Sequence, residues 1–119
     1  MTYTRGEIIL AELPFTDLSG SKVRPALVVQ SDHNNARLDD VILALITRTT
    51  TRAATEPTQL LIDLATPEGK ASGLLHTSAV KCEHLMTLHK SFIQRVIGRL
   101  PQPLLLKVDD CLRAALDLR

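Results

Sequence analysis

The sequence predicts a mainly β (α+β) protein in which a series of strands precedes one C-terminal α-helix. Short apolar runs separated by turn-rich segments recur as far as residue 99, and this pattern is typical of strands. Residues 103–118 instead place apolar side chains at helical spacing, opposite charged ones, which predicts an amphipathic helix packed on the sheet. The strands are expected near residues 6–13, 24–30, 40–47, 57–63, 74–83 and 93–99.

The third expected strand is the clearest. Val41 to Ile46 is an unbroken apolar run, as expected of a strand buried on both faces. It ends abruptly in hydroxyl and cationic side chains, which mark an edge of the core. These donors suit phosphate oxygens, although a solvated turn explains them equally well. The residues concerned are Thr47-Arg48-Thr49-Thr50-Thr51-Arg52.

The connection between the first two expected strands is a candidate functional loop. Residues 15–23 are polar and too many for a tight hairpin. Pro25 restricts Arg24 to an extended conformation, so the arginine is expected where the loop becomes strand. That is a suitable place for a preorganised cation. Residues 66–73 form a second turn-rich loop, to which we assign no chemistry.

Composition bounds the class of protein. A chain of 119 residues has the length of a single domain, expected over 1–119. No apolar run approaches the ~20 residues that cross a bilayer, and the first seven residues lack the apolar core of a signal peptide, so a cytoplasmic location is expected. Cys82 and Cys111 are too few for a disulfide framework or a zinc site, which predicts two reduced, partly buried thiols.

The net charge of +1 argues against extensive binding to nucleic-acid duplexes, which usually requires a large basic excess. A short single strand needs only a local cluster of donors. That cluster is expected from Lys22, Arg24, Arg48, Arg52 and Lys81.

Lys81 and Glu83 form a cation–carboxylate pair inside an apolar, strand-like run over residues 80–87. In an extended strand both side chains project from one face, roughly 7 Å apart, while Cys82 turns to the other. Such a pair can place an acid and a base on either side of one phosphodiester. Taken alone, a pair of this kind is more often a solvated face.

Three motifs, in chain order, resemble the PemK/MazF family of toxins from toxin-antitoxin pairs. They are Gly6-Glu7-Ile8, Arg24-Pro25-Ala26-Leu27-Val28-Val29 and Ile97-Gly98-Arg99-Leu100-Pro101, and the resemblance extends from about Gly6 to Leu116. It implies an SH3-like, partly closed antiparallel β-barrel with a C-terminal α-helix. It also implies a symmetric homodimer and a cognate antitoxin protein as partners.

The activity that the resemblance implies is sequence-selective endoribonuclease cleavage of single-stranded RNA or mRNA. The ribose 2′-OH attacks the adjacent phosphorus without a metal or other cofactor, which leaves 2′,3′-cyclic phosphate and 5′-OH ends. Two rival functions remain open. A CcdB-like toxin has the same fold but binds gyrase and cuts nothing, and a toxin-like protein can bind RNA or an antitoxin without cleaving.

The resemblance also implies roles for particular residues. Arg24 matches the family's Arg-Pro arginine, as acid or electrostatic clamp, and Thr47 matches the threonine that ends the third strand. Lys81 and Glu83 fall at a basic-x-acidic pair, with Glu83 as general base and Lys81 as acid or charge stabiliser. His84 is a further acid–base candidate. The expected RNA-binding residues are Phe15, Asp17, Lys22, Arg48, Thr49 and Arg52.

The remaining histidines, His33, His76 and His89, are expected to be structural residues. The chain also departs from the family just after the Lys81/Glu83 pair. Many members read Gln-x-Arg-Thr-x-Asp there, whereas this chain reads His84-Leu85-Met86-Thr87-Leu88-His89. The departure bears on the RNA sequence that is recognised more than on the activity.

Overall fold

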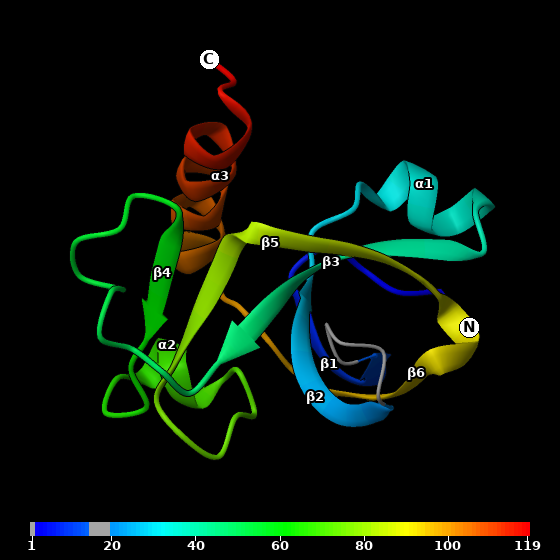
Figure 1. The fold of residues 1–119 in the computed structure, drawn as a ribbon, viewed down its shortest axis with the longest axis horizontal. Coiled ribbons are helices and arrows are strands. Elements are labelled where there is room, and N and C mark those ends of the chain that lie inside the picture. Colours follow the sequence, from blue (N-terminus) through cyan, green and yellow to red (C-terminus); the bar gives the residue numbers. More distant parts are fainter. Residues whose placement is uncertain (1, 15–19) are drawn as a thin grey trace.

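The computed structural model describes residues 2–14 and 20–119. Their strands form one antiparallel sheet in the order β4-β5-β3-β2-β1-β6 (Figure 1). The elements along the chain are β1 (Glu7–Pro14), β2 (Ser21–Val28), α1 (Asp32–Arg37), β3 (Asp40–Thr47), β4 (Gln59–Ile62), α2 (Pro67–Lys70), β5 (Ser78–His89), the 3₁₀ turn η1 (Lys90–Phe92), β6 (Ile93–Arg99) and α3 (Gln102–Leu116).

The fold class expected from the sequence is confirmed, since a curved antiparallel sheet carries one long C-terminal helix. β4 and β6 are the two ends of the strand order, so the described sheet is not closed into a complete barrel. The expected strands correspond to the six observed ones, apart from their ends. Among the described residues, no helix is long and apolar enough to span a membrane.

Both faces of the central strands are buried, in two separate apolar clusters. Ile8 and Leu27 belong to the cluster that α3 covers through Val108 and Cys111. Their neighbours on the same strands, including Ile9, Ala26 and Val28, belong to the second cluster on the opposite face. β3 contributes to both clusters, which confirms the two-faced burial that the apolar run 41–46 predicts.

β5 is longer and more irregular than the sequence predicts. Its pairing with β3 jumps from Ala44–Leu85 to Leu45–Lys81, so residues 82–84 form a bulge outside that ladder. Before the bulge β5 also pairs with β4, and after it the partner is β3 alone. Figure 1 shows β5 bending sharply part-way along its length. The expected strand 74–83 therefore covers only the first half, because a bulge breaks the alternation that periodicity detects.

Cys82 lies at this bulge and is fully buried, as is most of Cys111 on α3. Both are free thiols, as expected. Burial, reinforced by the neighbouring Cys111 and Glu83, raises the pKa of the Cys82 thiol to about 12. Cys82 therefore remains a protonated thiol that contributes to the core.

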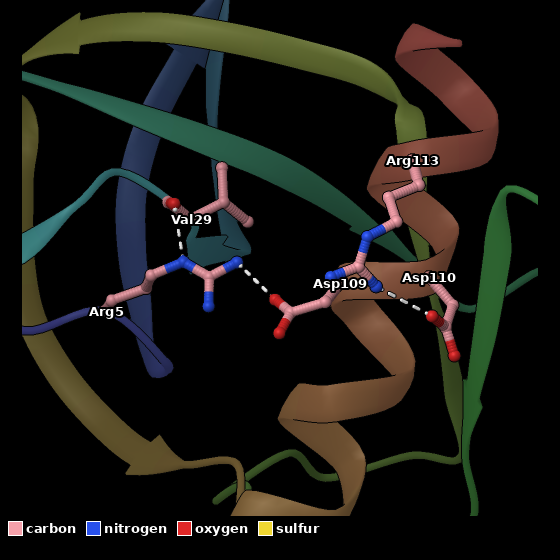
Figure 2. Close-up of polar contacts among 5 residues, drawn as sticks. All are labelled: Arg5, Val29, Asp109, Asp110 and Arg113. Atoms are coloured by element: carbon pink, nitrogen blue, oxygen red, sulfur yellow. Dashed lines mark hydrogen bonds and ion pairs between the residues drawn. The ribbon is translucent and has the colours of Figure 1, made fainter. Parts of the chain in front are cut away.

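The segment before β1 is fastened to α3 by Arg5 (Figure 2). Arg5 Nη2 donates to Asp109 Oδ1 at 2.7 Å, and Arg5 Nε donates to the Val29 carbonyl oxygen at 2.9 Å. Both ion-pair side chains are about three-quarters buried, with 26% and 28% exposed. A second pair on the same helix, Arg113–Asp110, is largely exposed. The Arg5 contacts fix the start of the sheet against the helix.

The structure adds two short helices that the sequence does not predict. In α1 the Ser31 hydroxyl accepts a hydrogen bond from the Asn34 N–H, and in α2 the Thr66 hydroxyl accepts one from the Gly69 N–H. These N-caps satisfy backbone donors in helices too short to show an apolar stripe. Hydrogen bonding alone marks them, so periodicity cannot find them.

Candidate phosphate-binding site

A cavity of about 640 Å³ opens on the sheet around the end of β3. Its strand lining comes from the neighbouring strands β6, β1 and β2 and from the last residues of β3. The apolar lining residues on these strands are Leu10, Val23, Pro25, Ile46, Val96 and Ile97. One wall is formed by the segment 73–78, which leads into β5.

The polar lining of this pocket is strongly cationic. It contains Lys22 and Arg24 from β2, Arg48 after β3, and Arg95 from β6. No aspartate or glutamate is among the described residues that line it. Guanidinium groups present planar, paired donors that match phosphate oxygens. The pocket is therefore suited to a phosphate-bearing ligand.

Arg24 reaches the pocket from inside β2, not from its first residue. The sequence predicts the arginine where the loop becomes strand, but β2 begins at Ser21. Arg24 pairs with Ala11 and Pro25 pairs with Leu10. The pairing with β1 therefore fixes the position of the Arg24 backbone. The side chain itself is exposed, which leaves the guanidinium available to a ligand.

Thr47 is the last residue of β3 and pairs with Ala79 of β5. Its hydroxyl accepts a hydrogen bond from the Thr49 N–H at 3.1 Å, which shapes the turn that follows. Arg48 and Thr49 lie in that turn and line the pocket, whereas Arg52 lies further along and does not. The abrupt change from apolar to hydroxyl and cationic residues thus coincides with the pocket edge.

The pocket brings together five of the residues expected from the sequence, which are Lys22, Arg24, Thr47, Arg48 and Thr49. Lys81, Glu83 and His84 are not among its lining residues. They lie on β5 at and beside the bulge. Phe15 and Asp17 lie outside the described residues.

Glu83 is exposed, and its carboxylate is directed to β4. Gln59 Nε2 donates to Glu83 Oε2 at 2.8 Å, and the Thr58 hydroxyl donates to Glu83 Oε1 at 3.0 Å. Desolvation raises the pKa of this carboxyl. Hydrogen bonds from Gln59, the backbone and Thr58, together with the Lys81 charge, more than offset it, so the pKa is lowered from its usual value. A carboxylate with a lowered pKa is a weaker base.

Three polar lining residues were missed by the sequence analysis, namely His76, Ser78 and Arg95. Arg95 lies on β6 and pairs with Leu10 of β1, whose other neighbour is β2. The sheet thus brings Arg95 to the same pocket as residues of β2 that are far from it in the chain. His76 was expected to be structural, yet its side chain is exposed and lines the pocket. The only local signal for the histidine was its place near the start of the expected strand 74–83, just after the turn-rich loop 66–73, whereas β5 begins only at Ser78.

Metal-ligating residues are not clustered in the part of the chain that the structure describes. There, no group of three or more histidine, cysteine, aspartate or glutamate side chains is arranged to hold a metal ion.

Comparison with known proteins gives the family. The model of the PemK-like, MazF-like toxins of type II toxin-antitoxin systems matches residues 4–116. The chain is 37% identical over 120 residues to endoribonuclease MazF6 of Mycobacterium tuberculosis, covering 99% of this chain and 100% of the relative. It is 31% identical over 119 residues to endoribonuclease EndoA of Bacillus subtilis, covering 99% and 97%.

A solved mycobacterial endoribonuclease in complex with its cognate antitoxin has the same fold, with a TM-score of 0.80 at 23% identity. The match covers 98% of this chain and 97% of that one. The fold and the pocket define a small β protein with a cationic cavity whose donors are of the kind that suits a phosphate group. The chain belongs to the PemK-like, MazF-like family of toxins of type II toxin-antitoxin systems. The expected class, a toxin-antitoxin endoribonuclease, is thereby confirmed at the level of the family.

Proposed function

We propose that this chain cleaves single-stranded RNA, including mRNA, at the pocket around Arg24 and Thr47. One observation carries the proposal. β2 and the end of β3 bring these two residues to one cavity, together with additional cations and no carboxylate among its described lining residues. Such a site holds a phosphodiester and stabilises the charge that grows on its oxygens during cleavage.

In the proposed reaction the ribose 2′-OH attacks the adjacent phosphorus and the 5′-oxygen leaves. Arg24 donates paired hydrogen bonds to the non-bridging oxygens, where negative charge develops. The Thr47 hydroxyl positions the same phosphate. Lys22, Arg48 and Thr49 bind the neighbouring backbone. The products are a 2′,3′-cyclic phosphate and a 5′-OH end.

The nucleophile in this reaction belongs to the substrate, so neither a metal-bound water nor a cofactor is required. DNA lacks the 2′-OH and is bound without being cut. Selectivity for particular bases is proposed to involve residues 84–89, where the chain departs from the family; they lie on β5 and are not among the described residues that line the pocket.

The catalytic roles expected for Lys81, Glu83 and His84 stay predictions, as do RNA contacts by Phe15, Asp17 and Arg52. The contacts of Glu83 with Thr58 and Gln59 support a structural role for this carboxylate in joining β4 to β5.

The partners proposed for this chain follow from its relatives. One solved relative is an endoribonuclease in complex with its cognate antitoxin, and Deinococcus radiodurans structures contain MazE with MazF. We propose that this chain likewise binds a cognate antitoxin protein, which blocks the cationic pocket. We further propose that residues 1–119 act as one domain, in a cytoplasmic homodimer.

A cleavage assay tests the proposed function. The purified chain is incubated with a long single-stranded RNA in excess EDTA, and the new ends are identified chemically. We expect cleavage to persist in EDTA and to stop when the ribose at the cleavage position is replaced by 2′-deoxyribose. A strict Mg²⁺ requirement, or cutting of the deoxy-substituted strand, contradicts the mechanism. Binding without cleavage identifies a toxin-like binding protein instead.

A further inference from the structure

His76 differs chemically from every other described side chain that lines the pocket. Lys22, Arg24, Arg48 and Arg95 contribute hydrogen-bond donors to the lining, and arginine as a class does not act as a base in proteins. The hydroxyls and apolar residues exchange no proton in this range. Histidine as a class changes charge between roughly pH 5 and pH 8. His76 is thus the only imidazole among the described side chains that line the pocket, and imidazole is the side chain that most often serves as a general base.

Two hydrogen bonds fix the chain at His76 and directly after it. The buried Ser78 hydroxyl donates to the His76 carbonyl oxygen at 2.8 Å, and the Thr77 hydroxyl accepts from the Leu64 N–H at 3.1 Å. These bonds fix the backbone from which the exposed His76 side chain projects. A fixed backbone limits the positions that a proton-transferring side chain can reach.

The same segment is anchored to β6 by direct backbone contact. Gly73 has a φ of +74°, and a Cβ built there would lie 1.9 Å from the Ile97 carbonyl oxygen. Three residues after His76, Ala79 pairs with Thr47. The segment that carries His76 therefore runs from a contact with β6, at Gly73, to the strand end that carries Thr47, at Ala79.

We infer that His76 is the general base of the proposed RNA cleavage. The inference deepens the proposed function and rests on it. The imidazole takes the proton of the 2′-OH as the 2′-oxygen bonds to phosphorus. The bond from phosphorus to the 5′-oxygen breaks with its electron pair, and the 5′-oxygen takes a proton from solvent. The imidazolium returns its proton to solvent, and no electrons are transferred.

The sequence-based candidate for this role, Glu83, is less well placed. Its carboxylate is bonded to Thr58 and Gln59 on the β4 side, and it is absent from the pocket lining. The two assignments differ in a measurable way, because only a base in the pocket controls the rate of the chemical step. Substituting His76 and Glu83 in parallel therefore separates them.

The test measures single-turnover cleavage between pH 5 and pH 9 for the parent chain, His76→Ala and His76→Gln. His33→Gln, an exposed histidine on α1, is the matched control. We expect both His76 variants to cleave about 10²- to 10⁴-fold more slowly and to lose the rise in rate with pH. Added imidazole should restore part of the rate of His76→Ala. Affinity for a 2′-deoxy-substituted RNA should be unchanged, as should the rate of His33→Gln.

Cleavage by His76→Ala at the parent rate overturns the inference and leaves the proposed function intact. A slower rate that keeps the parent pH profile and gains nothing from imidazole also overturns it, because that result describes a structural residue. If the parent chain cleaves no RNA, the proposed function itself fails. Thermal melts of each variant confirm that the fold is retained.

Discussion

Gln59 and Glu83 join β4 to β5 through a hydrogen bond of 2.8 Å between Gln59 Nε2 and Glu83 Oε2. Glu83 is one of the bulge residues 82–84, where β5 leaves the ladder of β3. Gln59 is itself 9% exposed, so its amide depends on this partner. The carboxylate thus supports an edge of the sheet at its least regular point.

We expect Glu83→Gln to reduce stability slightly and leave cleavage unchanged. The amide retains the shape of the carboxylate but places an NH₂ group against the donors of Gln59 and Thr58, and for an exposed site the cost is at most about 1 kcal/mol. Single-turnover rates and urea unfolding curves measure both quantities. A fall in rate of about 10²-fold or more in the folded variant contradicts this and restores Glu83 as the base.

The Glu83 contribution to stability should also depend on pH. Its pKa is lowered in the folded state, so the stabilisation is present above the unfolded pKa of about 4.3 and disappears as pH falls through the folded value. The Tm difference between the parent chain and Glu83→Gln should therefore be largest at neutral pH and vanish in acid. A difference that persists unchanged at low pH contradicts the assignment.

Replacement of Arg24 should remove cleavage without unfolding the chain. Losing one preorganised donor to a developing charge typically costs about 10²- to 10³-fold in rate, and Arg24 is exposed, so Arg24→Ala should melt near the parent Tm. Arg24→Lys should recover part of the rate, since it keeps the charge but not the paired donors.

The control for Arg24 is Arg37→Ala on α1, which removes an exposed cation outside the pocket. Single-turnover rates of all three variants are compared in one buffer. If Arg37→Ala cleaves RNA as slowly as Arg24→Ala, the lower rate is explained by the loss of net positive charge and not by the position of Arg24 in the pocket.

Gly73→Ala should destabilise the chain more than Gly6→Ala. Both glycines have a positive φ, +74° and +98°, so both changes strain the backbone. At Gly73 the new Cβ also meets the Ile97 carbonyl oxygen at 1.9 Å, whereas at Gly6 the nearest atom, at 3.2 Å, is a Leu105 methyl that can move. We expect about 2–4 kcal/mol for Gly73→Ala and about half of that for Gly6→Ala. Urea unfolding measures the loss of stability in both variants. Equal losses would contradict a clash between the new Cβ at position 73 and the Ile97 carbonyl oxygen.

The Arg5–Asp109 pair should show a larger coupling energy than the Arg113–Asp110 pair on the same helix (Figure 2). The first pair is mostly buried and shares Arg5 with the Val29 carbonyl, so we expect at least about 1 kcal/mol. The second is exposed, and pairs of its kind give about 0.3–0.5 kcal/mol. Double-mutant cycles to alanine, repeated at high salt, provide the comparison. Equal coupling energies would show that burial contributes nothing here.

The sequence predicts the elements whose side chains follow a regular period. The strand β3 is predicted because burial on both faces leaves an unbroken apolar run from Val41 to Ile46. The helix α3 is predicted because burial on one face leaves an apolar stripe at helical spacing. The bulge in β5 is not predicted, since it changes strand partners without changing the apolar composition. The helices α1 and α2 are missed because their caps, not their apolar residues, define them.

The site is predictable where one segment supplies the chemistry. Arg24 and Thr47 stand at recognisable positions beside Pro25 and at the end of an apolar run, and both line the pocket. Arg95 and His76 reach it through contacts between distant parts of the chain, for which no local pattern exists. Lys81 and Glu83 were expected in the site but do not line the pocket. Alternation along a strand predicts that two side chains share a face, but it does not predict which other residues lie next to that face.

Two reciprocal backbone contacts make one side of the pocket a single solid unit. A Cβ on Gly73 would collide with the Ile97 carbonyl oxygen, and one on Gly98 would lie 2.1 Å from the Ser72 carbonyl oxygen. At these two glycines no side chain separates residues 72–73 from β6, so no change of rotamer there lets the two backbones slide apart. Lys22 and Arg24, in contrast, line the pocket from β2 through exposed side chains. A ligand in the pocket therefore meets fixed backbone along one wall and adjustable side chains along another.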